Sequence, residues 1–266
     1  MVIVGERINT SRKRVRPAVE RKDAVFIQRE ARLQVEAGVT MVDVNCGTFV
    51  SDEPEYMAWL VETVQEEVDV PLCIDSPNPK AVEIALKTHK NGKPMINSIT
   101  DEEERFQEIL PLVLEYKASV VALCMAGGGM PITAEDRLKI ASNLIERLTS
   151  AGVPIGDIYV DPVVCPVATD VAYGRAVLDA IHRIMTQHEG VHTICGLSNV
   201  SYGLPLRKLI NQNFLTMSML MGLDGVILDP LDGRMMSNLM ATETLLGRDD
   251  FCMNYVMAHR EGKLVL

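Results

Sequence analysis

The stretch His192-Thr193-Ile194-Cys195-Gly196-Leu197-Ser198-Asn199-Val200-Ser201 shows the pattern on which the rest of the chain is built. A short apolar run is followed by Gly, Ser and Asn, and an apolar helical pattern then extends from Leu206 to Met221. This order predicts a buried strand, a polar loop at its carboxyl end and a helix. Because Gly, Ser and Asn are also ordinary turn formers, this loop alone does not establish a ligand site.

The same unit recurs along the whole chain. Strand-like apolar runs are found at 2–4, 40–45, 71–74, 94–96, 119–124, 158–160, 192–195 and 225–228. Helical patterns follow at 23–37, 55–68, 80–88, 102–117, 134–150, 171–186, 206–221 and 235–246, with a terminal helix at 251–258. Such alternation gives a parallel sheet, and eight units close as a (β/α)8 barrel. We therefore predict a single-domain α/β protein, a (β/α)8 TIM barrel over residues 1–266.

An open doubly wound sheet is the alternative architecture. The first strand–helix turn lacks the GxGxxG pattern expected there for dinucleotide binding, and Gly127-Gly128-Gly129 is not followed by Lys-Ser/Thr. That glycine triplet is interpreted as a flexible loop, either a lid or a place where a ligand approaches the backbone.

Composition limits the class of function. The 266 residues are 47% hydrophobic but only 5% aromatic, which suits a parallel sheet covered by helices. The net charge of −10 argues against a nucleic-acid partner, and the basic segment 12–16 is interpreted as a solvated loop. The sequence has no membrane-length apolar run and no signal-peptide pattern at its start, so we expect a cytoplasmic protein without a membrane partner.

The six cysteines carry no metal-binding pattern. They are Cys46, Cys73, Cys124, Cys165, Cys195 and Cys252. None forms a CxxC or a Cys/His pair at metal-ligand spacing, so no metal site is predicted. They are interpreted as small buried thiols in a reducing compartment.

Polar side chains gather where the predicted strands end, and in a barrel these ends all meet at one rim, where barrel active sites are built. They are Glu6, Asn9, Asp43, Asn45, Asp75, Asn97, Asp161, Ser198, Asn199 and Asp229. Carboxylates alone suit Mg²⁺. Mixed with amides, they match the amino group and ring N–H groups along one edge of a flat heterocycle.

Each of these residues also has a purely structural interpretation. A lone Asp or Asn at a strand end is often a helix cap or a turn former, and Asp43 and Asp229 are assigned to that class. Asp75, Asn97, Asp161 and Asn199 are predicted to contact a ligand because they occur together. Arg207 fits either a surface salt bridge or a contact to an anionic ligand tail.

With these residues in view, the sequence resembles the methyltetrahydrofolate:corrinoid protein methyltransferases, a branch of the pterin-binding methyltransferases. The resemblance covers nearly the whole chain and rests on the order and spacing of short motifs. These are Gly5-Glu6-Arg7-Ile8-Asn9, Asp43-Val44-Asn45, Asp75-Ser76, Met95-Ile96-Asn97-Ser98, Asp161-Pro162 and Gly196-Leu197-Ser198-Asn199-Val200-Ser201.

The resemblance implies a barrel that forms a homodimer and binds tetrahydrofolate or 5-methyltetrahydrofolate as substrate. Asp75, Asn97 and Asp161 would hold the pterin ring, and Asn199 would bond N5, which carries the methyl group, as the catalytic residue. Gly196 and Ser198 would shape the pocket, and Arg207 would lie toward the aminobenzoyl-glutamate tail. Relatives often carry an amide where this chain has Tyr202, so no role is transferred to that residue.

The resemblance also implies a corrinoid (cobalamin) as the second reactant. The sequence has no Asp-x-His-x-x-Gly corrinoid-binding pattern, so a separate corrinoid protein is the expected partner. The same pocket residues would serve acetyl-CoA synthesis or the removal of methyl groups from methylated amines, so the direction of transfer stays open.

Two other functions compete with this hypothesis. A dihydropteroate synthase-like condensing enzyme shares the pterin pocket, but here Asp161-Pro162 is followed by Val163-Val164-Cys165-Pro166, and no Ser-Arg-Lys follows the seventh strand. A non-catalytic folate-binding protein would keep the pocket without turnover. A barrel subunit with a purely structural role is disfavoured by the full set of polar strand ends.

Overall fold

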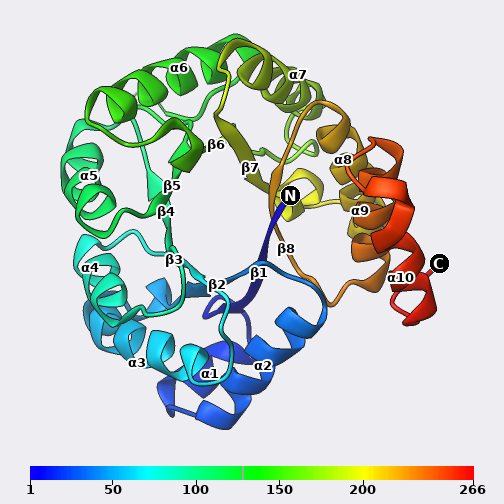
Figure 1. Ribbon diagram of the computed structural model, residues 1–266. Coiled ribbons are helices and arrows are strands. Elements are labelled where there is room, and N and C mark those ends of the chain that lie inside the picture. Colours follow the sequence, from blue (N-terminus) through cyan, green and yellow to red (C-terminus); the bar gives the residue numbers. More distant parts are fainter. Residues whose placement is uncertain (128) are drawn as a thin grey trace.

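The computed structural model describes residues 1–127 and 129–266, and its eight strands form one closed parallel barrel in chain order (Figure 1). The strands are β1 (Val2–Asn9), β2 (Met41–Asn45), β3 (Leu72–Asp75), β4 (Met95–Ile99), β5 (Ser119–Leu123), β6 (Ile158–Asp161), β7 (His192–Gly196) and β8 (Gly225–Leu228). β1 pairs with both β2 and β8, which closes the ring. The predicted (β/α)8 TIM barrel is confirmed.

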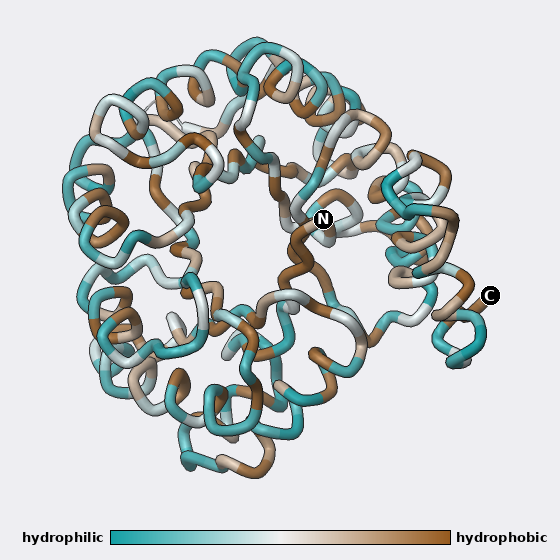
Figure 2. The backbone as a smooth tube through the Cα atoms, in the orientation of Figure 1, coloured by the Kyte–Doolittle hydropathy of each residue, from teal (hydrophilic) through white to brown (hydrophobic). Residues whose placement is uncertain are grey.

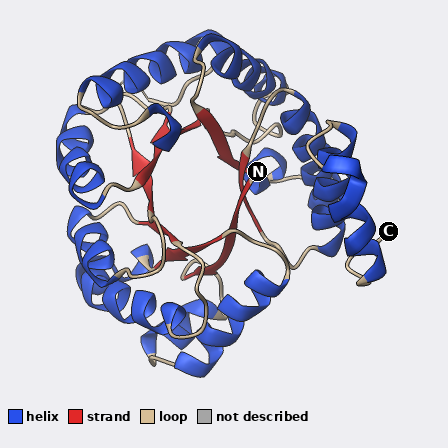
Figure 3. Ribbon diagram, in the orientation of Figure 1, coloured by secondary structure: helices blue, strands red, loops and turns tan. Residues whose placement is uncertain are grey.

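Helices surround the ring of strands (Figure 3). They are α1 (Val15–Glu20), α2 (Ala24–Glu36), α3 (Glu53–Gln65), α4 (Pro79–Thr88), α5 (Glu103–Tyr116), α6 (Ala134–Ser150), α7 (Ala172–Gln187), α8 (Arg207–Leu220), α9 (Gly233–Leu245) and α10 (Met253–Arg260). Nine of these were predicted to within a few residues. None of the described helices is both long and apolar enough to cross a membrane.

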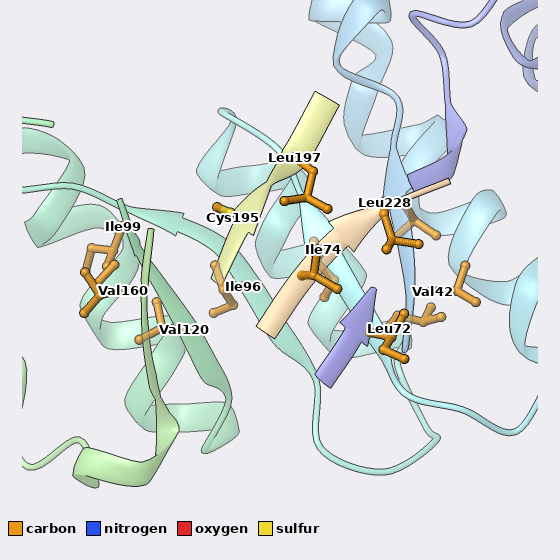
Figure 4. Close-up of a cluster of buried hydrophobic side chains, with 14 of the residues drawn as sticks. Val42, Leu72, Ile74, Ile96, Ile99, Val120, Val160, Cys195, Leu197 and Leu228 are labelled. Atoms are coloured by element: carbon orange, nitrogen blue, oxygen red, sulfur yellow. The ribbon is translucent and has the colours of Figure 1, made fainter. Parts of the chain in front are cut away.

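Alternation along each strand separates two cores, because successive side chains point to opposite faces of a strand. Outward-facing residues such as Val42, Ile74 and Val120 are fully buried against the helices, and Figure 4 shows this layer. The helices carry both hydrophobic and hydrophilic segments, as expected for elements with one buried face (Figure 2).

The inward-facing positions form a second, smaller core with one residue from each strand. Its members are Val4, Met41, Cys73, Met95, Val121, Tyr159, Ile194 and Ile227. This apolar layer fills the barrel from within. The next inward position on each strand lies two residues further along and nearer to the carboxyl rim.

Two predictions about the first part of the chain were wrong. The segment 12–16 is not wholly a solvated loop, because Val15 begins α1 and buries its side chain together with Ala18 and Val19. The strand predicted at 2–4 extends to Asn9. It continues through charged residues because Glu6 lies inside the barrel mouth, while Arg7 is paired with Glu30 of α2.

Candidate functional site

The second inward position of most strands is polar. In chain order these positions are Glu6, Asp43, Asp75, Asn97, Leu123, Asp161, Gly196 and Asp229. The apolar layer below them forms the floor, and the open rim lies above. Strand alternation therefore brings four of the predicted residues, Asp75, Asn97, Asp161 and Gly196, to the same inner surface.

Asp75 and Asn97 are direct neighbours in the register of β3 and β4. The side-chain amide of Asn45 donates to Asp75 Oδ2 at 2.8 Å, and Asn45 Oδ1 accepts from the N–H of Gly47, which fixes the orientation of that amide. Burial raises the pKa of Asp75, while the hydrogen bond from Asn45 lowers it. A donor-rich ligand edge here would favour the ionised carboxylate.

Asp43 is neither a helix cap nor a turn former, so that assignment was wrong. Its side chain is 2% exposed and lies inside the barrel, and Oδ1 has no hydrogen-bond partner among the described residues. Burial, reinforced by the nearby charge of Asp75, raises its pKa well above the usual range. Its position two residues after the apolar Met41 on the same strand is the sequence signal that could have placed it.

Asp161 is the last residue of β6, and a backbone N–H of the following loop donates to its carboxylate. The N–H of Val163 donates to Oδ1 at 2.8 Å. Burial raises the pKa of Asp161 to about 7, although the N–H of Val163, the Arg137 guanidinium and the N–H of Gly196 all favour the charged form. The bond from Gly196 joins the ends of β6 and β7 at one point. Near neutral pH this carboxylate is therefore only part ionised.

The loop that carries Ser198 and Asn199 is a short 3₁₀ helix, Leu197–Ser201. Arg207 at the start of α8 holds it, donating to Ser198 O at 2.6 Å and to Ser201 Oγ at 3.0 Å. The salt-bridge interpretation of Arg207 was wrong, since no described carboxylate pairs with it. The Asn199 side chain is exposed at the rim.

Two other arginines hold strand-end loops in the same way. Arg105 of α5 donates to Ser76 O and Pro77 O at 2.9 Å, and to Ser98 O at 2.8 and 3.0 Å. Arg137 of α6, itself fully buried, donates to Pro162 O at 2.7 Å and Val163 O at 3.2 Å. The loops next to Asp75, Asn97 and Asp161 are thus tied to the outer helices by charge-assisted bonds.

A cavity of about 670 Å³ opens at the rim beside β1, β8 and α8. Ser198 and Arg207 line it, together with Glu6, Asn9 and Arg12. Burial raises the pKa of Glu6 to about 7, against the opposing charge of Arg12. Glu6 also acts electrostatically on Asp43, so the cavity adjoins the inner ring that holds Asp75.

Asp229 lines the same cavity. The prediction that it is a turn former is confirmed, but it also makes two ion pairs. It accepts the N–H of Leu231, as a turn former does. It also pairs with Arg7 at 3.0 Å and with Arg12 at 2.8 Å. The hydrogen bonds and charges of these arginines outweigh burial and lower the pKa of Asp229.

No role was transferred to Tyr202 from the resemblance. Its surface is 67% exposed, and the centroid of its ring lies 5.8 Å from the guanidinium carbon of Arg207. The glycine loop 127–129 includes residue 128, which lies outside the described residues. Five of the six cysteines are buried free thiols, as predicted, whereas Cys252 is exposed.

The assembled surface suits one kind of ligand. It offers carboxylate and amide oxygens along one inner wall, a closed apolar floor, and a polar cavity with arginines beside it. A flat heterocycle with an amino group and ring N–H groups would donate to Asp75 and Asp161, while Asn97 can both donate and accept. The side of the heterocycle away from this wall would face the rim and Asn199.

Comparison with known proteins gives the family. The profile described as "Pterin binding enzyme" matches residues 5–229. The chain is 36% identical to the methylcorrinoid:tetrahydrofolate methyltransferase of Eubacterium limosum over 270 residues, which cover 99% of this chain and 98% of that protein. It is 30% identical to the methionine synthase of Mycobacterium tuberculosis over 85% of this chain, but spans only 20% of that longer protein.

Solved structures show the fold. The dihydropteroate synthase of Anaplasma phagocytophilum with bound 6-hydroxymethylpterin-monophosphate superposes with a TM-score of 0.70 at 16% identity, covering 92% of this chain and 99% of the other. The enzyme from Xanthomonas albilineans with 4-aminobenzoic acid gives a TM-score of 0.67 at 16% identity, covering 93% and 92%. At this identity the likeness concerns the barrel alone.

Proposed function

This chain belongs to the pterin-binding enzymes and, within them, to the folate- and corrinoid-dependent methyltransferases, and from that membership we propose its reaction. It transfers a methyl group between the cobalt of a corrinoid held by a separate protein and N5 of tetrahydrofolate. The relative from Eubacterium limosum is named for transfer from methylcorrinoid to tetrahydrofolate, so we assign that direction here.

The observation that carries the proposal is the inner wall of Asp75, Asn97 and Asp161. A pterin has an amino group and a ring N–H side by side, which a carboxylate can accept in two-point fashion. We assign two further boundaries of this pterin pocket to Gly196, whose N–H bonds Asp161, and to Ser198, which lines the rim cavity. Held by its donor edge against this wall, the pterin presents N5 toward the rim, where Asn199 is exposed.

In the assigned direction the lone pair of N5 forms a bond to the methyl carbon, and the carbon–cobalt bond breaks with its electron pair remaining on cobalt. N5 becomes a cation that still carries its proton, which then leaves to water at the open rim. Asn199 is neutral, so it stabilises this charge by accepting a hydrogen bond from N5–H. The wall contributes orientation.

A spectroscopic assay tests the proposal. Methylcobalamin mixed with tetrahydrofolate and the protein should lose its methyl-cobalt absorbance with time, while 5-methyltetrahydrofolate accumulates. The reaction should require all three components. Binding of tetrahydrofolate without turnover, with methylcobalamin or any corrinoid protein, would instead identify a non-catalytic folate-binding protein. Methyl transfer without a cobalamin species would refute the class of reaction.

The dihydropteroate synthase alternative is disfavoured by the loops. No cationic side chain occurs in Val163–Pro166 after β6 or in Gly196–Asn199 after β7, although that chemistry must stabilise a leaving pyrophosphate. A condensation assay with 4-aminobenzoate should therefore give no product.

We also propose a homodimer in the cytoplasm. An apolar groove of about 450 Å³ between α7 and α8 is lined by Leu178, Leu209, Phe214 and Met217, and Leu209 is 59% exposed. A patch of this kind favours self-association. Light scattering should give a molar mass of two chains for the parent protein. In Leu209→Glu the molar mass should fall toward that of a single chain. The six free cysteines support a reducing compartment.

A further inference from the structure

The basic segment Arg12-Lys13-Arg14-Val15-Arg16 lies beside the mouth of the site. Between Ile8 and Val19 the chain has no acidic residue, although the protein as a whole carries a net charge of −10. Lys13, Arg14 and Arg16 are exposed and pair with no carboxylate among the described residues. This concentration of free positive charge is not used by methyl transfer.

A second cavity lies against this segment and next to the rim cavity. It measures about 210 Å³ and shares Arg7 and Arg12 with the rim cavity, and Lys13 and Arg14 also line it. Four cations face this second cavity against one carboxylate, that of Glu30. Arg7 and Arg12 are already paired with Asp229, so the uncompensated charge lies outward, on Lys13 and Arg14. A path from the rim cavity past Arg12 to Lys13 and Arg14 therefore carries uncompensated positive charge.

We propose that this path is a subsite for the γ-linked polyglutamate tail of folate, with Lys13 and Arg14 contacting the glutamates beyond the first. The proposal rests on the proposed function. A pterin held against Asp75 and Asp161 directs its tail outward, and each added glutamate brings one more carboxylate. The acidic surface of a corrinoid protein would be a different occupant. The tail is favoured because the second cavity shares Arg7 and Arg12 with the rim cavity, which Ser198 and Arg207 also line.

Calorimetry with two ligands tests this inference separately from the function. The dissociation constant of tetrahydrofolate with one glutamate reports binding to the pterin pocket alone. That of the form with five γ-linked glutamates reports binding to the pocket and to the path together. At low ionic strength we expect the pentaglutamate to bind about three- to tenfold more tightly, the range for a few exposed ion pairs. Added salt should narrow this ratio, because exposed charges are screened.

The variant K13Q/R14Q should bring the ratio of the two dissociation constants close to one. The control K90Q/K139Q removes the same charge at exposed positions that line neither cavity, and it should keep the parent ratio. Equal affinities in the parent protein, or an unchanged ratio in K13Q/R14Q, would overturn the subsite. A change confined to the KM for the corrinoid protein would overturn it too and mark a docking surface. Failure of the monoglutamate to bind would instead refute the proposed function.

Discussion

At the scale of single residues, the proposed site would separate groups that hold the ligand from Asn199, the group proposed to act on N5. Asp75 and Asp161 end β3 and β6, Asn97 lies in the middle of β4, and all three belong to the inner wall. Asn199 lies on a loop and is exposed. Binding and chemistry should therefore respond differently to substitution.

Asn199→Ala should lower kcat about 10- to 100-fold, while the dissociation constant of tetrahydrofolate should change less than threefold. The reason is that a hydrogen bond which strengthens as N5 becomes charged acts mainly on the transition state. Stopped-flow absorbance of the corrinoid and calorimetry give the two values. Gln107→Ala, at an exposed amide on α5 whose side chain bonds only Glu103 of its own helix, is the control and should match the parent. Unchanged turnover with normal binding in Asn199→Ala would remove the catalytic role.

The pKa of Asp161 near 7 predicts a pH-dependent affinity. Burial raises that pKa, and the ligand's donors require the ionised carboxylate. Tetrahydrofolate should therefore bind more tightly as pH rises from 6 to 8, by up to about tenfold per pH unit below the pKa. Asp161→Asn should weaken binding at pH 8 and flatten the profile.

Glu6 titrates in the same range, so Glu6→Gln is the matched comparison for Asp161→Asn. If the pH dependence of tetrahydrofolate affinity persists in Asp161→Asn and disappears in Glu6→Gln, then Glu6 and not Asp161 is the titrating group.

At the scale of elements, the sequence predicted the eight strands and nine of the ten helices of the described residues, because apolar periodicity dominates long segments. The short helix α1 was missed because its six residues, which include Arg16, Pro17 and Glu20, give too little periodicity. β1 was cut short because its charged second half is stabilised by partners distant in sequence, Glu30 and Asp229. The wall residues were found by their position at strand ends, whereas Asp43 required knowledge of which face of β2 points inward.

Arg105 illustrates what periodicity cannot predict, because its role appears only when the loops after β3 and β4 lie beside α5. Arg105→Ala should lower the free energy of unfolding by about 2–4 kcal/mol, since it leaves carbonyl oxygens of Ser76, Pro77 and Ser98 without their charged donor. Folate binding should weaken as well, because Asp75 and Asn97 lose their fixed position. Urea unfolding and calorimetry measure the two effects.

Glu104→Ala on the same helix, an exposed position, is the control for Arg105→Ala. Arg105→Lys keeps the charge with fewer donors and should be intermediate in both measurements. Equal folate affinity in parent and Arg105→Ala would restrict the arginine to a stabilising role.

At the scale of the whole molecule, an unliganded barrel with buried acids should be more stable at mildly acidic than at alkaline pH. The pKa values of Asp161 and Glu6 rise to about 7 from ordinary values of 3.8 and 4.5, mainly through burial. The native state therefore binds more protons than the unfolded chain between these limits, and stability falls as pH rises through the window. The hydrogen bond to Asp224 raises the pKa of His192, so its contribution is also lost with rising pH. Carboxylates with lowered pKa, such as Asp229, lose their contribution only below about pH 4.

Urea unfolding from pH 5 to 8 should accordingly show a free energy of unfolding that declines with pH, on the order of 3 kcal/mol for each of the two acids as an upper limit. Asp161→Asn should flatten the decline, because an amide keeps the buried shape and never ionises. Saturating tetrahydrofolate should also reduce the decline of the free energy of unfolding with pH. The ligand stabilises the ionised carboxylates of the inner wall and therefore binds most tightly at high pH. A parent protein whose stability rises steadily from pH 5 to 8 would show that these carboxylates are ionised at little cost without ligand. The wall would then be a preorganised anion rather than a set of acids whose charge the pterin stabilises.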